Sequence, residues 1–389
     1  MSHIAESIRI VVWGTYDTGK PRVRMMLRGL DESGAEVIHC HSEVWHGIED
    51  KSGVVSWKDR IRFLFRWFWR YPLLVIRYLK LPMHDVVVIG YLGHLDILIL
   101  WPFAKWRGVP IIWDAFLSLY NTVVEDRKLI GRRNPLSLGL YAWEWLACRA
   151  ATLVILDTKA HAGYFERCFK LPADRTADVL VGAETDIFVP QTTEIDREKD
   201  DKQSVSVLFY GQFIPLHGIE TIIKAATQLE DEPFEWQFIG QGQEAERIRA
   251  LLEQHPLPRL NWTRWVPFHE LPGWIQRADV CLGIFGDTSK ANLVIPNKAY
   301  QILAVGKPLI TRDSAAIREL ITQDHVGIFL VPPADPEALV DALLKFKHQA
   351  NQLGRGPLHC DLLHKIEPAA IGRRLVQLAR NIVDSTRNL

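Results

Sequence analysis

The sequence of 389 residues is short of cysteine, of net charge and of long uncharged apolar runs. Its five cysteines are odd in number and none stands in a Cys-x-x-Cys pair, which indicates a reduced, cytosolic protein rather than a disulfide framework. Lys plus Arg and Asp plus Glu both total 46, so the bulk charge favours no nucleic-acid partner. The N-terminus has no basic stretch followed by a long apolar one, so we expect no signal peptide.

What the chain does have is a repeated alternation of short apolar runs with helical stretches, the pattern of βα units and parallel sheets. We expect strands at residues 8–13, 36–40, 85–90, 110–114 and 152–157, then at 205–210, 235–240, 260–266, 279–285, 307–311 and 326–331. The charged segment 191–203 interrupts the two series and is expected to be an exposed linker. The sequence therefore predicts an α/β chain of two doubly wound domains, 1–190 and 204–366, that face each other across the active-site cleft.

The last segment, residues 367–389, is expected to form a helix. Ile371, Leu375, Leu378 and Ile382 recur at helical spacing and make one apolar stripe. This spacing alone does not say which domain the stripe packs against.

Two glycine-containing loops follow strands of the second half. In the first, GQFIPLHG, the Gly211 backbone, the Gln212 amide and the His217 imidazole could face a phosphate, with His217 supplying a proton or positive charge. The alternative is a solvated histidine at a helix start. In the second loop, FIGQGQE, Gly240 and Gly242 would let the backbone approach an anionic ligand, or would only make a tight turn.

A lysine at the start of a helix is the third candidate for donor binding. In the stretch IPNKAYQILAVGKP, Pro296 stands near the start of the expected helix, which puts Asn297 and Lys298 in the first helical turn. A cation there opposes the helix dipole, and a bound diphosphate would compensate for it. The alternative is a solvated lysine.

In the first half, polar groups follow several strands. The loop GTYDTGKPR begins at Gly14 and lacks the Gly-x-Gly-x-x-Gly spacing of a dinucleotide site, although it could line the cleft. Asp114, Asp157 and His161 stand at or after strand ends, either as substrate ligands or as helix caps, and Asp157 and Thr158 resemble caps. We expect His217, Asp114 and His161 to be the catalytic groups.

Histidines and a cysteine gather at residues 39–46. His39, Cys40, His41 and His46 fit no zinc spacing, and His39 and His41 lie at a period of two on one strand face. We therefore expect no metal site.

The segment Trp57–Lys80 combines seven bases, eight aromatic residues and one acid, Asp59. Its spaced bases argue against a membrane span, whereas aromatic rings and cations together suit a surface of anionic lipid. We expect Pro72 to kink or end the helix. The alternative is an amphipathic helix that packs on its own domain.

The second half resembles the nucleotide-sugar domain of family-4 glycosyltransferases of GT-B fold. The matching stretches are VLFYGQFIPLHGIETIIKA, FIGQGQE, WVPFHELPGWIQRADVCLGIF and IPNKAYQILAVGKPLITRDSAAIREL, in the family's order over residues 205–331. In the first half, DAFLSLYNT, LDTKAHAGYF and VGAETDIFVP match more loosely.

This resemblance implies retaining transfer of a sugar from a nucleotide sugar, without a metal or other cofactor, to a lipid-linked or surface-glycan acceptor. It also implies that the final helix crosses back onto the first domain, and it places Phe268 and Gln301 in the donor site. The family usually has a pair of glutamates where this sequence has Leu293 and Gln301, and an Arg and a Lys where it has Gln212 and His217. Gln301 could bind a ribose hydroxyl as a neutral amide, and Lys298 could supply the missing charge.

Three functions are compatible with the sequence. The first is a glycosyltransferase at the inner face of the membrane. The second, motivated by the missing glutamates, is a non-catalytic nucleotide-sugar-binding or assembly protein of the same fold. The third is another two-domain α/β enzyme, such as an epimerase or a phosphorylase. The positive charge at Lys298 and His217 favours the first two.

Overall fold

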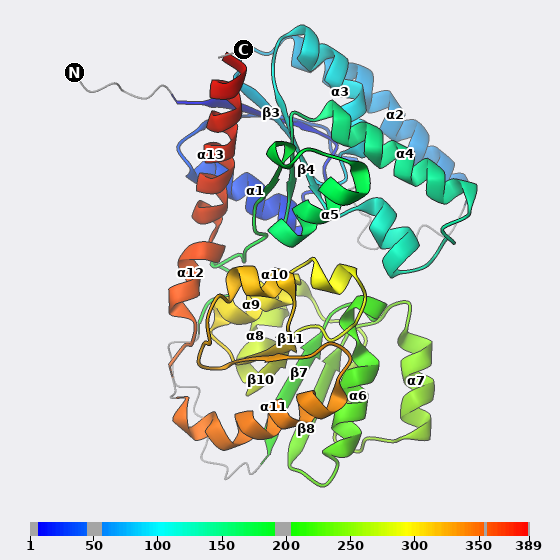
Figure 1. Ribbon diagram of the computed structural model, residues 1–389, viewed down its shortest axis with the longest axis vertical. Coiled ribbons are helices and arrows are strands. Elements are labelled where there is room, and N and C mark those ends of the chain that lie inside the picture. The colour runs from blue at the N-terminus through cyan, green and yellow to red at the C-terminus, as the bar shows by residue number, and fades with distance from the viewer. Residues whose placement is uncertain (1–6, 45–56, 191–203, 354–355, 388–389) are drawn as a thin grey trace, which may run out of the picture. The chain divides into compact units, whose positions relative to one another are not determined.

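The chain folds into two compact α/β units (Figure 1). The structure, a computed structural model, describes residues 7–44, 57–190, 204–353 and 356–387. Within these, the first unit consists of residues up to Asn121, of Ile130–Val181 and of the chain from Pro368, and the second of Thr122–Leu129 and Gly182–Glu367. The linker expected at 191–203 lies outside the described residues.

The first unit is built on a six-stranded parallel sheet of order β2-β1-β3-β4-β5-β6. Its strands are β1 (Arg9–Gly14), β2 (Glu36–His41), β3 (Val86–Ile89), β4 (Ile111–Phe116), β5 (Leu153–Leu156) and β6 (Thr176–Asp178). The five strands expected from apolar runs are confirmed to within two residues. The short edge strand β6 was not expected, because its three half-buried residues include only one apolar side chain.

Helices cover both faces of this sheet. They are α1 (Pro21–Glu32), α2 (Trp57–Leu79), α3 (His94–Trp106), α4 (Pro135–Ala150), α5 (Lys159–Phe169) and α13 (Pro368–Arg387). One core cluster joins α2, α3, α4 and α5 to one face, and a second joins α1 and α13 to the other. Helix α2 continues through Pro72, so of the two expected outcomes, a kink or an end of the helix, the end is excluded.

The final helix packs along α1, as the family resemblance implied (Figure 1). The stripe residues Ile371, Leu375 and Leu378 are buried, which confirms the expected apolar face. The two helices approach most closely at Gly29 and Gly372, where a Cβ on Gly372 would overlap the Gly29 carbonyl oxygen. The crossing therefore depends on the absence of side chains at both positions.

The second unit has another six-stranded parallel sheet, of order β12-β11-β10-β7-β8-β9. Its strands are β7 (Val205–Tyr210), β8 (Phe234–Ile239), β9 (Leu260–Thr263), β10 (Val280–Leu282), β11 (Leu309–Arg312) and β12 (Ile328–Val331). All six strands were expected, and apart from the early ends of β9 and β10 their bounds agree within two residues. Two doubly wound, Rossmann-like sheets are thus confirmed.

Seven α-helices of the second unit are described: α6 (Ile219–Gln228), α7 (Ala245–Gln254), α8 (Leu271–Arg277), α9 (Asn297–Val305), α10 (Ala315–Leu320), α11 (Pro336–Gln349) and α12 (Cys360–Ile366). Helices α6 and α11 pack together over the core cluster of this sheet. Eight residues from the middle of the first half, Thr122–Leu129, also belong to this unit, within and after a π-helix at Asn121–Asp126. No periodicity in the sequence indicated this.

Candidate functional site

The candidate donor site lies where β7 ends and the loop to α6 begins. Gly211 has a backbone φ of 140°, which residues other than glycine rarely adopt. A Cβ on Gly211 would lie 2.9 Å from His217 Cε1 and 3.1 Å from Lys298 Nζ. The glycine therefore brings the backbone against two basic side chains, and the structure unites three residues that the sequence predicted for one site.

Lys298 is a buried cation, with only 5% of its surface exposed. Its Nζ donates to the Gly283 carbonyl at 3.2 Å and lies 3.9 Å from the centre of the Phe209 ring. It forms no ion pair with any carboxylate of the described residues, and burial holds its pKa well below the usual range. The alternative of a solvated lysine is thus excluded, and a bound anion would favour the charged form of this buried amine.

His217 is also buried, and its Nδ1 donates to the backbone carbonyl of Gln212. Burial, and secondarily the charge of Lys298, lower the pKa of the imidazole well below its ordinary value. A carbonyl can only accept, so Nδ1 carries the hydrogen of a neutral ring and Nε2 is left as an acceptor. Burial therefore disfavours a positive charge on His217, and its predicted role as a proton donor stays a prediction.

Gln301 lies on α9, one turn after Lys298, and is almost buried. Its Oε1 accepts a 2.9 Å hydrogen bond from the Tyr210 hydroxyl at the end of β7. This bond fixes the amide and leaves its NH₂ group as the part that could meet a ribose hydroxyl. Asn297, at the start of α9, is half-buried.

The glycines of the FIGQGQE loop pack against protein backbone. A Cβ on Gly240 would overlap the Gly211 carbonyl oxygen, and one on Gly242 would lie 2.7 Å from both the nitrogen and the oxygen of Phe213. The Phe213 nitrogen donates to the Gln241 carbonyl at 3.0 Å. These glycines hold two loops together, and this close approach explains them without a ligand.

Phe268 begins the short turn before α8 and is 36% exposed. Its ring meets the buried ring of Phe188 edge to face, with centroids 5.6 Å apart. Phe188 thus holds the predicted donor residue in place and leaves part of its ring accessible.

Arg312, which the sequence analysis did not select, is a further buried basic residue of the second unit. It ends β11, is 5% exposed, and its Nη1 donates to the Gly286 carbonyl. Burial lowers the pKa of this guanidinium, opposed by Asp287. A basic residue at the end of a buried strand was the signal that could have identified it.

In the first unit, the loop after β1 is filled by a carboxylate. Asp96 accepts from the Thr15 nitrogen at 2.7 Å, from the Thr15 hydroxyl at 2.9 Å and from the Tyr71 hydroxyl at 2.6 Å. A Cβ on Gly14 would overlap Asp96 Oδ2. Asp96 therefore fills the space beside Gly14, and burial raises the pKa of this carboxyl. The donor-binding role of Gly14 stays a prediction.

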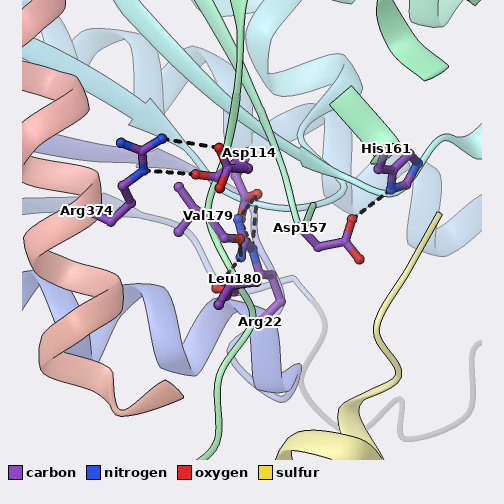
Figure 2. Close-up of polar contacts among 8 residues, drawn as sticks. Arg22, Asp114, Asp157, His161, Val179, Leu180 and Arg374 are labelled. Carbon is purple, nitrogen blue, oxygen red and sulfur yellow. Dashed lines mark hydrogen bonds and ion pairs between the residues drawn. The ribbon is translucent and has the colours of Figure 1, made fainter. Parts of the chain in front are cut away.

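Asp114, at the end of β4, is fully buried against Arg22 (Figure 2). The Arg22 Nε and Nη2 lie 2.9 Å and 2.8 Å from its two oxygens, and Nη1 donates to the carbonyls of Val179 and Leu180. Burial raises the pKa of Asp114, and Arg22 opposes that rise. This geometry supports a structural ion pair and gives no support to the predicted catalytic role.

Asp157 and His161 form a second buried pair (Figure 2). His161 Nδ1 lies 2.8 Å from Asp157 Oδ1, while Asp157 Oδ2 and His161 Nε2 are buried without a hydrogen-bond partner in the structure. Thr158 caps α5 by accepting from the His161 nitrogen, which confirms one of the two expected caps. The catalytic role of His161 stays a prediction.

The histidines of β2 line a surface pocket that carries positive charge. His39, Cys40 and His41 share it with Arg77 and Lys80, whose charges disfavour a metal cation. The part of the chain that the structure describes holds no group of three metal-ligating side chains, and His46 lies outside that part.

Comparisons with known proteins agree with this architecture. Residues 204–348 match the family described as Glycosyl transferases group 1. A protein named as a colanic acid biosynthesis glycosyl transferase, WcaI of Escherichia coli (strain K12), is 29% identical over 190 residues, which are 43% of this chain and 46% of that one. A protein named as glycosyltransferase WbjE, of Pseudomonas aeruginosa, is 30% identical over 138 residues, 34% of this chain and 33% of that one. The match thus spans less than half the length of each relative.

Solved structures extend the likeness to the whole chain. Sucrose-phosphate synthase from Thermosynechococcus elongatus has a TM-score of 0.69 at 17% identity, over 97% of this chain and 100% of that one. Anabaena HepE in complex with UDP-glucose has a TM-score of 0.60 at 14% identity, over 98% and 100%. These findings establish the GT-B fold, and the match to the group 1 family lies within the second unit.

Proposed function

We propose that this protein is a glycosyltransferase that binds a nucleoside diphosphate sugar in its second unit and transfers the sugar, with retention and without a metal, to a lipid-linked or surface-glycan acceptor. The observation that carries the proposal is Lys298, a buried lysine without a carboxylate partner in the described residues, beside the Gly211 backbone at the end of a parallel strand. Burial lowers its pKa, and a bound anion would favour its charged form. The diphosphate of a donor would supply the missing negative charge.

The comparisons support the same reading. The group 1 domain covers the loop of Gly211 and helix α9. Two of the similar structures are complexes of HepE with UDP and with UDP-glucose, and one relative is named for colanic acid biosynthesis. These names motivate a nucleotide-sugar donor and a glycan or glycan-lipid acceptor for this chain.

Replacing Lys298 by Met tests donor binding directly. We expect Lys298→Met to weaken nucleoside diphosphate binding by about 1.5–3 kcal/mol, since it removes a charge-assisted interaction and keeps the apolar stem. The fold should survive, because removing an unpaired buried charge also removes its burial cost. Calorimetry with UDP, GDP and ADP measures the change.

Lys345→Met is the matched control, because Lys345 is exposed and its Nζ lies 5.9 Å from the centre of the Phe329 ring. The affinity of Lys345→Met for nucleoside diphosphates should equal that of the unmodified protein. Equal affinities for Lys298→Met and Lys345→Met would remove Lys298 from the donor site.

A non-catalytic nucleotide-sugar-binding protein is the second candidate, since Gln301, a neutral amide tied to Tyr210, stands where the resembling family has a carboxylate. Incubation with a panel of nucleotide sugars, with and without lipid-linked acceptors, separates the two. Acceptor-dependent release of nucleoside diphosphate supports the transferase. Tight binding of the nucleotide sugar without release supports the binding protein.

We also propose that the first unit binds a membrane surface through its helices α2, α3 and α4. Within the described residues, no helix has the combination of length and hydropathy needed to span a bilayer. However, α2, α3 and α4 lie side by side on one face of the first sheet (Figure 1). These helices carry exposed large apolar side chains. They include Phe68, Trp69, Leu73, Ile76, Trp101, Trp106, Leu138 and Leu146, with Trp69 66% and Trp106 79% exposed.

The charges on these three helices favour anionic lipid as the occupant. The acids in their described portion, Asp96 and Glu144, are buried, while Arg70, Arg77 and Lys105 are exposed. Large apolar rings and basic side chains on one surface match the headgroup region of an anionic bilayer. The surface that the sequence placed in Trp57–Lys80 thus extends in this proposal to α3 and α4; the side chains of 57–67 lie outside the described ones.

Replacing Arg70, Arg77 and Lys105 together by Ser should weaken binding to vesicles with anionic lipid about 100-fold, at about 1 kcal/mol for each cation. Co-sedimentation at low salt measures it, and the remaining binding should be less sensitive to salt. Trp69→Gln with Trp106→Gln should also release the protein, whereas Trp265→Gln, a 63% exposed tryptophan of the second unit, should not. No sedimentation of the unmodified protein with anionic vesicles would refute the proposed surface.

A further inference from the structure

The segment Thr122–Leu129 is anchored to the second unit at the carboxyl ends of three strands. Its Thr122 Oγ1 accepts from Lys290 Nζ at 2.7 Å, and its Arg127 carbonyl accepts from Gln243 Nε2 at 3.2 Å. Arg127 Nη2 in turn donates to Gln212 Oε1 at 3.3 Å. Gln212, Gln243 and Lys290 follow β7, β8 and β10, so the segment lies at the edge of the sheet where the candidate donor site is.

The guanidinium of Arg127 makes few polar contacts with the described residues. It forms no ion pair with any described carboxylate, that of the adjacent Asp126 included, and its one side-chain hydrogen bond goes to the neutral amide of Gln212. Its Nε is buried without a hydrogen-bond partner in the structure. An arginine has five N–H donors in a fork that fits two oxygens of a phosphate, so most of this capacity remains available.

Gln212 connects Arg127 to the rest of the site. Its side chain accepts from Arg127, and its backbone carbonyl accepts from His217 Nδ1. His217 and Lys298 both approach Gly211, the residue before Gln212. Arg127 is also near enough for its charge to act on the His217 imidazole. Two cations, Arg127 and Lys298, therefore flank one loop, and neither is neutralised by a carboxylate of the described residues.

We infer that Arg127 is a ligand of the donor diphosphate, delivered to the site by the segment Thr122–Leu129. The inference rests on the proposed function, since it assigns a second cation to the same site. Lys298 can supply at most one positive charge, whereas a nucleoside diphosphate carries more than one negative charge. A guanidinium at Gln212 would bind phosphate oxygens bidentately and add to the neutralisation that Lys298 begins.

The test compares diphosphates with monophosphates. Calorimetric titration of the full chain uses UDP and GDP against UMP and GMP, with Arg127→Gln, Arg127→Lys and, as the matched control, Lys128→Gln, the neighbouring exposed lysine. We expect Arg127→Gln to weaken diphosphate binding about tenfold or more, and monophosphate binding much less, since a charge-assisted pair is lost. Arg127→Lys should be intermediate because a charge remains without the fork, and Lys128→Gln should be unchanged.

A purely structural role of Arg127 predicts a different pattern. Gln243→Ala removes the hydrogen bond to the Arg127 backbone and loosens the segment without touching the guanidinium. If Gln243→Ala reproduces the full loss, or if Arg127→Gln weakens monophosphates and diphosphates equally, Arg127 only holds the segment and the inference is overturned. Melting temperatures check that each variant is folded. If Arg127→Gln does not fold, the comparison of diphosphates with monophosphates is made with Arg127→Lys.

The same titrations separate this inference from the proposed function. Loss of diphosphate binding in Lys298→Met but not in Arg127→Gln would overturn the role of Arg127 and leave the donor site intact. Failure of the unmodified protein to bind any of the four nucleotides would overturn both.

Discussion

Asp114→Asn is expected to lower the free energy of unfolding by about 3–5 kcal/mol, the cost of leaving the buried guanidinium of Arg22 without its counter-charge. Both residues are at most 2% exposed, so water cannot replace the lost carboxylate. The carbonyls of Val179 and Leu180 would still accept from Arg22, but they bring no negative charge. Chemical denaturation of the purified variant measures the loss.

The matched control is the exposed ion pair of Asp313 and Arg318, at 2.7 Å with side chains 42% and 46% exposed. Asp313→Asn should cost less than about 1 kcal/mol, because solvent screens such pairs. The same experiment tests the catalytic role predicted for Asp114. Normal turnover per folded molecule of Asp114→Asn confirms a structural role, while a stable but inactive variant would restore the catalytic one.

Gly372→Val is expected to cost about 3 kcal/mol, at the upper end of what overpacking usually costs. A Cβ on Gly372 would overlap the backbone of Gly29, which cannot move aside as a flexible side chain could. Helices α1 and α13 would have to separate, and the buried stripe that begins at Ile371 would lose contact with the sheet. Thermal melting measures the change.

Gly139 offers the control, because it also lies inside a helix, α4, but an added Cβ would meet nothing within 4 Å. Gly139→Val should leave stability unchanged or raise it slightly, as valine favours helix more than glycine does. Equal melting temperatures for the two variants would show that α1 and α13 do not depend on this close approach.

The sheets and their order along the chain could be predicted because parallel strands are buried on both faces and stand out as short apolar runs. Lys298 could be selected as a candidate for donor binding for a similar local reason, since a lysine in the first turn of a helix is unfavourable without a ligand. Its burial against Phe209 could not be seen, because the two residues lie far apart in sequence.

Several site predictions rested on a polar residue or a glycine at a strand end, and the structure shows partners there that the sequence did not indicate. Gly14 and Gly240 do sit at strand ends, yet a carboxylate and a carbonyl of the protein itself occupy the space beside them. Asp114 meets Arg22, which is 92 positions away in the sequence. Long-range partners of this kind leave no periodic signal in the sequence. The assignment of Thr122–Leu129 to the second unit left no such signal either.

The position of α13 has a consequence for how the protein is made. The face of the first sheet that α13 covers is complete only after Pro368–Arg387 has been synthesised, while the second unit needs no residue beyond Glu367. At about 5–20 residues per second, a ribosome takes on the order of 1–4 s to make the 20 residues of Pro368–Arg387 after the second unit is complete. Small domains fold in seconds or less, so on the ribosome the second unit can complete its fold while the half begun first still waits for its last helix.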